Sequence, residues 1–313
     1  MLLKFFLKLG CYLQIFAKDG TLTMISQPKL QYLINLICYT LAFGLSAVTH
    51  SSDRFDAPIQ IKTLGNGAVY TGQIKNHKFH GRGVLTFPDG RRYEGEFSDG
   101  AANGSGVFSW PNGDKFLGNW VDDQFHGSGK YEFADGRTYA GQWRRNRKEG
   151  KGIFTWPNED SYVGEFLAGS KHGRGIFVWS DGDKYVGSFM LDEISGEGEY
   201  FFADGGYYYG NFKGGKSDGF GRFEGANGDI YIGSWRSAQK HGFGYFFWAN
   251  GDRYSGNFVD DKLQGFGAYF FRNGGSYTGH FKNDKRDGHG VMKFADGTLK
   301  KGFWKEDVFI NAQ

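Results

Sequence analysis

The chain has 313 residues, and 37 Lys and Arg against 34 Asp and Glu give a formal net charge of +3. A charge this close to balance gives no indication of nucleic-acid binding. The two cysteines, Cys11 and Cys38, both lie near the start of the chain, which excludes a disulfide framework for the remainder.

Residues 1–52 form an apolar N-terminal segment, which we expect to act in targeting or anchoring. Met1–Ala17 is short and apolar but interrupted by lysines, a pattern typical of an amphipathic helix at a membrane surface. Residues 30–49 carry no charge and are about long enough to span a bilayer as a helix. Read from Met24, the same stretch resembles a secretory signal peptide. Two alternatives therefore stay open: a retained anchor or a cleaved signal, with the true start at Met1 or at Met24.

Lysines precede the uncharged run, at Lys4, Lys8, Lys18 and Lys29. The positive-inside rule then places everything after the run on the far side of the membrane from the cytoplasm. We therefore predict a membrane-associated or exported protein.

After a linker at residues 53–64, a repeat begins and continues to residue 304, followed by a tail at 305–313. An aromatic anchor recurs every 23 residues, with glycine two positions later and a large residue two positions after that. The anchors are Tyr70, Tyr93, Phe116, Tyr139, Tyr162, Tyr185, Tyr208, Tyr231, Tyr254 and Tyr277. A fixed period in the range of 20–50 residues is the signature of a repeat array, which grows by length and needs no single large core.

The second half of each period contains paired glycines, two large residues and a turn, as in Gly81, Gly83 and Asp89-Gly90. Asn-Gly or Asp-Gly between alternating runs is the strongest short-range hairpin signal. A three-residue loop at Pro88-Asp89-Gly90 would pair Leu85 with Tyr93 and place aromatics and glycines on one face, whereas a two-residue loop would separate them. We therefore predict one hairpin in each period, with a three-residue loop.

The expected fold is all-β: an elongated, single-layer antiparallel sheet of about ten hairpins, preceded by a hydrophobic helix. No apolar second layer follows in the sequence, so the aromatic face itself must be the core, with rings lying over the glycines of neighbouring strands. At about 10 Å per hairpin the array would be roughly 100 Å long.

The pattern Tyr-x-Gly-x-Phe/Trp, His-Gly-x-Gly and Asp-Gly resembles the MORN repeat (membrane occupation and recognition nexus) over about residues 65–304. Three departures stand out: Gly225 in place of an aromatic, Glu159 in place of the turn glycine, and Lys300 in place of the anchor tyrosine. We expect them to produce a weakened seam, an altered turn and a terminal cap.

The repeated positions give little support for a metal site, a phosphate-binding loop or a catalytic site. His80, His126, His172 and His241 share one repeat position, but successive repeats lie about 10 Å apart, too far for one zinc ion. Other repeats place polar groups there that can bond nearby backbone. The glycine pairs lack the lysine and helix of a phosphate-binding loop. We predict no catalytic residues, no metal, no cofactor and no enzymatic activity.

The resemblance implies a scaffold that presents an aromatic groove to a protein partner at or across a membrane. The predicted groove comprises Tyr93, Phe97, Phe108, Trp110, Trp120, Tyr139, Trp143, Trp156, Tyr162, Phe177 and Trp179. The alternative implied by the family name is binding of an acidic phospholipid, a phosphoinositide or phosphatidic acid, through the basic residues Arg144, Arg145, Arg147 and Lys148. A solvated loop accounts for that basic run more simply.

Overall fold

The computed structural model describes residues 14–16, 22–24 and 58–312. The chain divides into two units, Met1–Asp56 and Ala57–Gln313. In the first unit, β1 (Gln14–Phe16) and β2 (Leu22–Met24) form an antiparallel pair. The expected span at residues 30–49 and most of the expected amphipathic helix at 1–17 lie outside the described residues. Within the described ranges, no helix combines the length and apolarity that crossing a bilayer would require.

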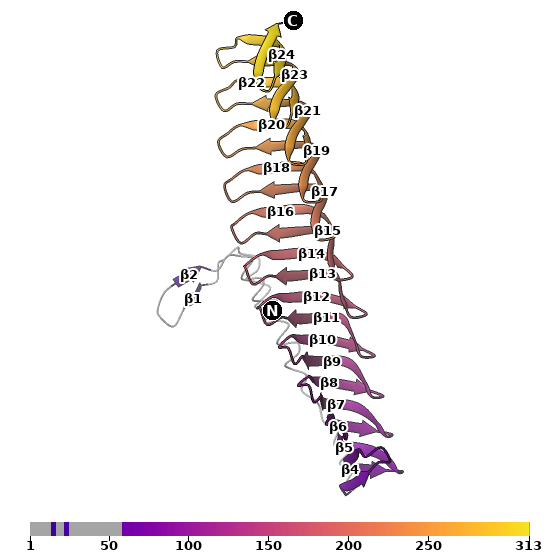
Figure 1. Cartoon of the computed structure of the whole chain (residues 1–313). Helices are drawn as coiled ribbons and strands as arrows, with labels where there is room; N and C mark the ends of the chain where they lie inside the picture. Colours follow the sequence, from indigo (N-terminus) through magenta and orange to yellow (C-terminus); the bar gives the residue numbers. More distant parts are fainter. Residues whose placement is uncertain (1–13, 17–21, 25–57, 313) are drawn as a thin grey trace, which may run out of the picture. The chain divides into compact units, whose positions relative to one another are not determined.

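The second unit is a single antiparallel sheet of strands that follow one another in chain order (Figure 1). At its ends, β3 (Gln60–Thr63) pairs with β4 alone and β25 (Val308–Ala312) with β24 alone, so the sheet is open. Both edge strands lie outside the repeat boundaries expected from the sequence: β3 in the expected linker and β25 in the expected tail. At about 4.8 Å per strand, 23 strands extend over roughly 100 Å.

Two kinds of strand alternate between these edges. The seven-residue strands contain the anchors, with Lys300 at the anchor position of the last: β4 (Val69–Lys75), β6 (Arg92–Ser98), β8 (Lys115–Val121), β10 (Thr138–Arg144), β12 (Ser161–Leu167), β14 (Lys184–Met190), β16 (Tyr207–Lys213), β18 (Ile230–Arg236), β20 (Arg253–Val259), β22 (Ser276–Lys282) and β24 (Leu299–Lys305). The nine-residue strands contain the paired glycines: β5 (Lys78–Thr86), β7 (Ala101–Ser109), β9 (Gln124–Glu132), β11 (Arg147–Thr155), β13 (Ser170–Val178), β15 (Glu193–Phe201), β17 (Lys216–Glu224), β19 (Gln239–Phe247), β21 (Lys262–Phe270) and β23 (Lys285–Lys293).

The predicted three-residue loop is confirmed. Leu85 pairs with Tyr93, the Phe87 amide donates to the Arg91 carbonyl, and the Gly90 amide donates to the Phe87 carbonyl. Gly90 has φ +88°, the left-handed conformation that closes a type I turn of this kind. Glu159 adopts the same conformation at φ 73°, and its amide still donates to Trp156. The turn expected to be altered therefore keeps its geometry, although a glutamate there is strained by about 1 kcal/mol or more.

The other connection in each repeat is a two-residue turn. At Asn76-His77, for example, φ is 49° and 66°, which defines the type I′ turn that matches strand twist. The second turn residue also links repeats: Asp123 accepts from the amide of Ala102, and Asp192 accepts from that of Lys171. Each turn thus holds the preceding repeat in register.

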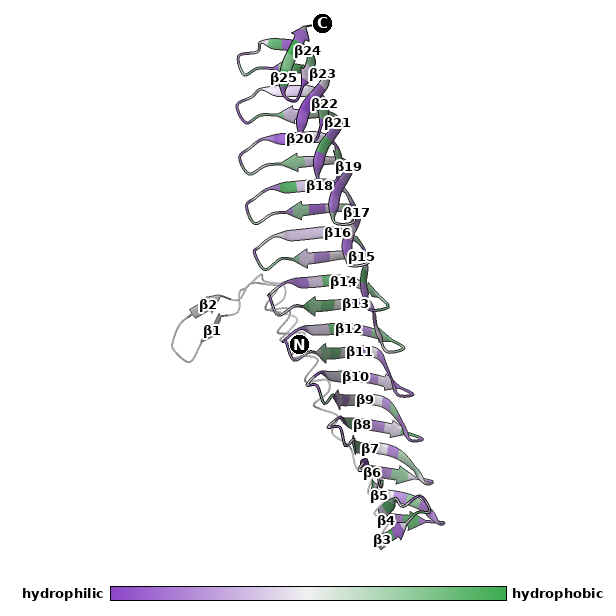
Figure 2. Cartoon of the chain, viewed as in Figure 1, coloured by the Kyte–Doolittle hydropathy of each residue, from purple (hydrophilic) through white to green (hydrophobic). Residues whose placement is uncertain are grey.

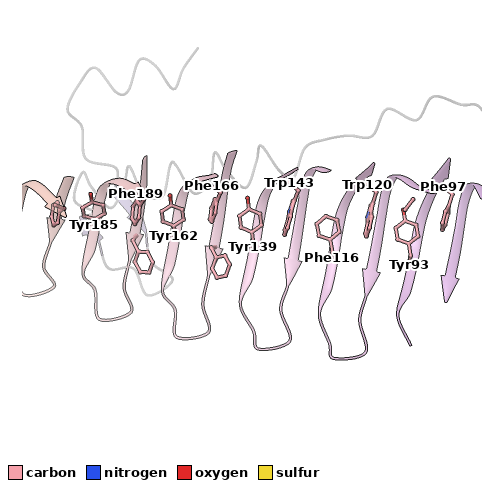
Figure 3. Close-up of a cluster of buried hydrophobic side chains, with 14 of the residues drawn as sticks. Tyr93, Phe97, Phe116, Trp120, Tyr139, Trp143, Tyr162, Phe166, Tyr185 and Phe189 are labelled. Atoms are coloured by element: carbon pink, nitrogen blue, oxygen red, sulfur yellow. The ribbon is translucent and has the colours of Figure 1, made fainter. Parts of the chain in front are cut away.

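The core is the aromatic face, as predicted. Figure 3 shows anchor rings and their partners projecting from successive strands in one continuous row. Glycines make room for them: a Cβ placed on Gly83 would lie 2.6 Å from the Tyr70 ring. Hydrophobic and hydrophilic residues intersperse within the strands (Figure 2), as expected of a sheet with only one apolar face in contact with a core.

Candidate functional site

Most of the predicted groove is core. Seven of its eleven aromatics are at most 8% exposed: Tyr93, Phe97, Trp120, Tyr139, Trp143, Tyr162 and Phe177. Their rings pack edge to face, as Tyr93 does against Phe97 at 5.0 Å and against Trp120 at 5.0 Å. A partner could reach these side chains only by opening the sheet, so they stabilise the site rather than contact a ligand.

The anchor tyrosines carry a second role that the sequence pattern did not reveal. The Tyr93 hydroxyl donates to the Glu96 carbonyl at 2.9 Å, and the Tyr185 hydroxyl donates to Ser188 at 3.1 Å. In each repeat this carbonyl lies beside a shift in strand register, where ladder pairing is interrupted. Burial accordingly raises the pKa of Tyr185, Tyr254 and Tyr277 to about 12 each.

The remaining four groove residues, Phe108, Trp110, Trp156 and Trp179, are partly exposed and lie near the three-residue loops. The three tryptophans belong to a longer row, whereas Phe108 lies two residues before Trp110. We call this row the hairpin-end row: Phe87, Trp110, Phe133, Trp156, Trp179 and Phe202. Each member packs against an aromatic of the next repeat, as Trp110 does against Tyr131 at 5.4 Å and Trp179 against Tyr200 at 5.3 Å. Phe87, Phe133 and Phe202 were missing from the prediction, although their repeat position identifies them.

The row is interrupted at Gly225, where a ring is absent. The buried aromatics accordingly form two clusters, one from Tyr70 to Phe212 and one from Tyr231 to Trp304, with Trp235 packing against both. The expected seam is therefore present in the packing.

The basic residues do not all share one environment. Arg144 ends β10, Arg145 lies in the following turn and Arg147 begins β11, and all three are exposed. Lys148 instead turns toward the core, with its Nζ 4.7 Å from the centre of the Phe154 ring and 5.2 Å from that of Phe166. Burial lowers the pKa of Lys148. The exposed patch is thus the arginine triplet, and Lys148 belongs to the packing.

The histidine position is explained by backbone bonding in several repeats. At that position, Asn103 accepts from the amide of Asp122 and Glu149 from that of Ala168, while Asp218 and Gln264 make the equivalent bonds. Each receives an amide of the adjacent two-residue turn. Across the described part of the chain, no three His, Cys, Asp or Glu side chains gather as a metal site requires.

The fold and this row define a class of protein: a linear β-hairpin array with a partly exposed aromatic edge. The model of the MORN repeat matches residues 70–91, 93–115, 116–136, 139–161, 162–184, 185–207, 208–230, 231–253, 254–276 and 277–299. The chain therefore belongs to the MORN-repeat family.

No curated protein matches the sequence significantly. Among solved structures, the TCP10 domain of Danio rerio CPAP (E1021V mutant) is 16% identical, with 71% of this chain and 99% of that chain covered at a TM-score of 0.34. The Drosophila melanogaster SAS-4 TCP domain, solved with a proline-rich motif of Ana2, is 13% identical, with 64% and 90% covered at a TM-score of 0.29. Scores this low support no inference about this chain.

Proposed function

We propose that this chain is a non-enzymatic scaffold whose hairpin-end row captures a protein partner at or across a membrane. The repeat architecture supports a binding scaffold, because an array of this kind offers a long surface. The observation that carries the finer proposal is the partial exposure of Trp110, Trp156 and Trp179 along one edge. Partly buried tryptophans, held in place by their neighbours, are the anchors that dominate protein interfaces.

The geometry favours the row over the buried aromatics. Trp156 contacts Phe154 at 4.4 Å and Phe177 at 5.3 Å, so its ring is fixed before a partner arrives. A fixed ring loses little conformational entropy on binding, which raises affinity. The absence of a ring at Gly225 limits the continuous part of the row to the repeats before it.

The test uses the full chain immobilised on beads, with captured proteins quantified from cell extract. The variant with Trp110→Ser, Trp156→Ser and Trp179→Ser should lose the captured set. Replacement of the same three residues by Phe should retain it, because Phe occupies this position at Phe133 and Phe202. Thermal unfolding of both variants establishes that they are folded. Capture of the same proteins by the folded Ser variant would contradict the proposal.

Membrane association is proposed to come from the N-terminal segment. Its support is the uncharged run at residues 30–49 preceded by lysines. Fractionation of cells that express the chain with and without residues 1–52 tests it, together with protease access to the array from outside. Recovery of the full-length protein in the cytoplasmic soluble fraction would contradict this part.

Acidic-lipid binding remains a second candidate because Arg144, Arg145 and Arg147 are all exposed at one turn. Three clustered cations could contact lipid phosphates.

A further inference from the structure

Three phenylalanines are exposed on the face of the sheet opposite the core. Phe220, Phe243 and Phe266 lie on β17, β19 and β21 and are 61%, 50% and 56% exposed. Each stands between the paired glycines of its repeat, exactly one repeat from the next in sequence. We call these three residues the second-face stripe. β17, β19 and β21 succeed one another along the orange part of the array in Figure 1.

The fold does not require aromatics at this position. The six preceding repeats place polar or charged residues there: Arg82, Ser105, Ser128, Lys151, Arg174 and Glu197. Those repeats have the same strand lengths and register. Three consecutive exposed rings at a position that elsewhere tolerates serine therefore point to an interaction rather than to packing.

Small polar side chains alternate with the rings. Phe220 pairs with Ser234, Phe243 with Asn257 and Phe266 with His280 on the intervening strands. Because neighbouring strands lie about 4.8 Å apart, the rings repeat at about 10 Å along the array, with a hydrogen-bonding group between each pair. The stripe thus has a linear period along the long axis of the sheet.

Two of the three rings pack against a neighbouring ring, and hollows lie on the same face of the sheet. Phe243 meets Tyr245 edge to face at 5.3 Å, and Phe266 meets His280 at 5.6 Å. A hollow of about 760 Å³ lies beside Tyr245, Ser255 and Phe270, and one of about 280 Å³ lies beside Phe266 and His280. Phe243 and Phe266 are therefore held by a neighbour, and Phe266 borders open space.

The charge of the stripe selects among linear ligands. The five positions Phe220, Ser234, Phe243, Asn257 and Phe266 carry no formal charge. Beside them, Arg222 is paired with Glu224, and Arg253 lies beside the larger hollow. A single-stranded nucleic acid also stacks on aromatics, but its phosphates require a basic track beside them. A neutral polymer with apolar faces and many hydroxyls fits this surface better.

We propose that the second-face stripe binds an extended, uncharged β-1,4-linked polysaccharide lying along the array. The C–H faces of pyranose rings stack on aromatic side chains, and their hydroxyls bond to groups such as those of Ser234 and Asn257. In an extended β-1,4 chain successive sugars alternate in orientation, so the same face recurs once per disaccharide, at about the two-strand spacing of the phenylalanines. This ligand and this face are separate from the protein partner proposed for the hairpin-end row.

The test measures binding of the full-length protein to cellohexaose and to chitohexaose by calorimetry, two arms that distinguish a plain glucan from an N-acetylated one. Binding to at least one should strengthen from disaccharide to hexasaccharide, because a longer chain reaches all three rings. The variant with Phe220→Ser, Phe243→Ser and Phe266→Ser should lower hexasaccharide affinity about tenfold or more. Serine occupies the same position in two other repeats, so this variant should fold.

Leu117→Ser is the matched control, because Leu117 is 54% exposed on the same face outside the stripe. It should leave affinity unchanged, and raised salt should do the same. Three results would overturn the proposal. They are no binding of either hexasaccharide, binding that the triple variant retains, and a self-association detected by analytical ultracentrifugation that the triple variant abolishes.

Discussion

The glycines beneath the anchor rings are positions where a single substitution should cost much stability. A Cβ added to Gly95 would lie 2.5 Å from the Gly106 Cα and 2.7 Å from the Ser105 carbonyl, both backbone atoms that cannot move aside cheaply. Gly95→Val should therefore destabilise the array by about 3 kcal/mol or more. Val84→Thr, on the opposite face, should change stability by about 0.5 kcal/mol or less. Thermal unfolding measures both, and equal shifts would contradict the account of the core.

Anchor hydroxyls make stability depend on alkaline pH. The folded-state pKa of Tyr185 and of Tyr254 is raised to about 12 from an ordinary value of 10.0, because burial disfavours the tyrosinate. A raised folded-state pKa means that the stabilisation is complete below pH 10 and is lost as pH rises from 10 to 12. A tyrosinate also cannot donate the hydrogen bond to the backbone carbonyl.

We therefore expect cooperative unfolding between pH 10 and 12, followed by circular dichroism and tyrosinate absorbance, since several anchors share this shift. Changing Tyr185 and Tyr254 to Phe should make that loss shallower, and Phe116 shows that an anchor position accepts a ring without a hydroxyl. Full tyrosine titration near pH 10 without unfolding would be inconsistent with these buried anchors.

The two kinds of turn in each repeat differ in how well the sequence predicted them. The three-residue loops were predictable because Asp-Gly or Asn-Gly marks nearly all of them and parity fixed their register. The two-residue turns were not, because residues as different as Asn76-His77, Leu191-Asp192 and Ser237-Ala238 adopt the same positive φ values. The first glycine of each pair was also misread: Gly81 lies at φ +63° beside Gln73, so it is needed for a bulge and not to accommodate a ring.

Side-chain direction explains the errors in the predicted site. The aromatic pattern located the face but could not separate buried Trp120 from partly exposed Trp110, because both belong to the same alternation. Lys148 looked like part of a basic loop. The equivalent position is Phe125 in the preceding repeat and Lys171 in the following one, and all three side chains pack on rings. A long lysine stem replaces a hydrophobic residue there.

The seam at Gly225 should be the hairpin end that opens first. It joins the two aromatic clusters with no ring of its own, so fewer contacts oppose local unfolding there. Amide hydrogen exchange should be fastest at residues 226–230 among the three-residue loops. A Cβ added to Gly225 would lie 2.7 Å from the Asn227 Oδ1, so that side chain has to shift to admit a ring. Trp110 and Trp248 precede turns of the same kind, in which Asn112 and Asn250 accept from the amide two residues on.

Gly225→Phe should accordingly slow exchange at residues 226–230 and raise the unfolding temperature. Exchange that is uniform along the array, or unchanged in the variant, would contradict a seam.

At the scale of the whole molecule, the proposed functions differ in the interaction that would bind a ligand to the array. An array builds a long surface from one repeated unit, so its ligand is selected by where individual repeats depart from the pattern. The hairpin-end row is interrupted at Gly225, the second-face stripe begins at Phe220, and the arginine triplet occurs at one turn. The two leading functions use different residues: protein capture would use the hairpin-end row, and acidic-lipid binding would use the arginine triplet.

Acidic lipid would have to be bound by charge. Each Arg near an anionic surface contributes about 1 kcal/mol, and salt weakens it. Of the four residues in the predicted patch, Arg144, Arg145 and Arg147 are exposed, whereas Lys148 lies over the core rings. We therefore expect residues 53–313 to bind anionic liposomes weakly at physiological salt, and Glu at all three arginines to leave partner capture intact. Lys213→Glu with Lys216→Glu, at the corresponding exposed turn of another repeat, is the control. Tight, salt-sensitive liposome binding that the arginine reversal abolishes and the lysine reversal spares would replace the scaffold with a lipid-binding module.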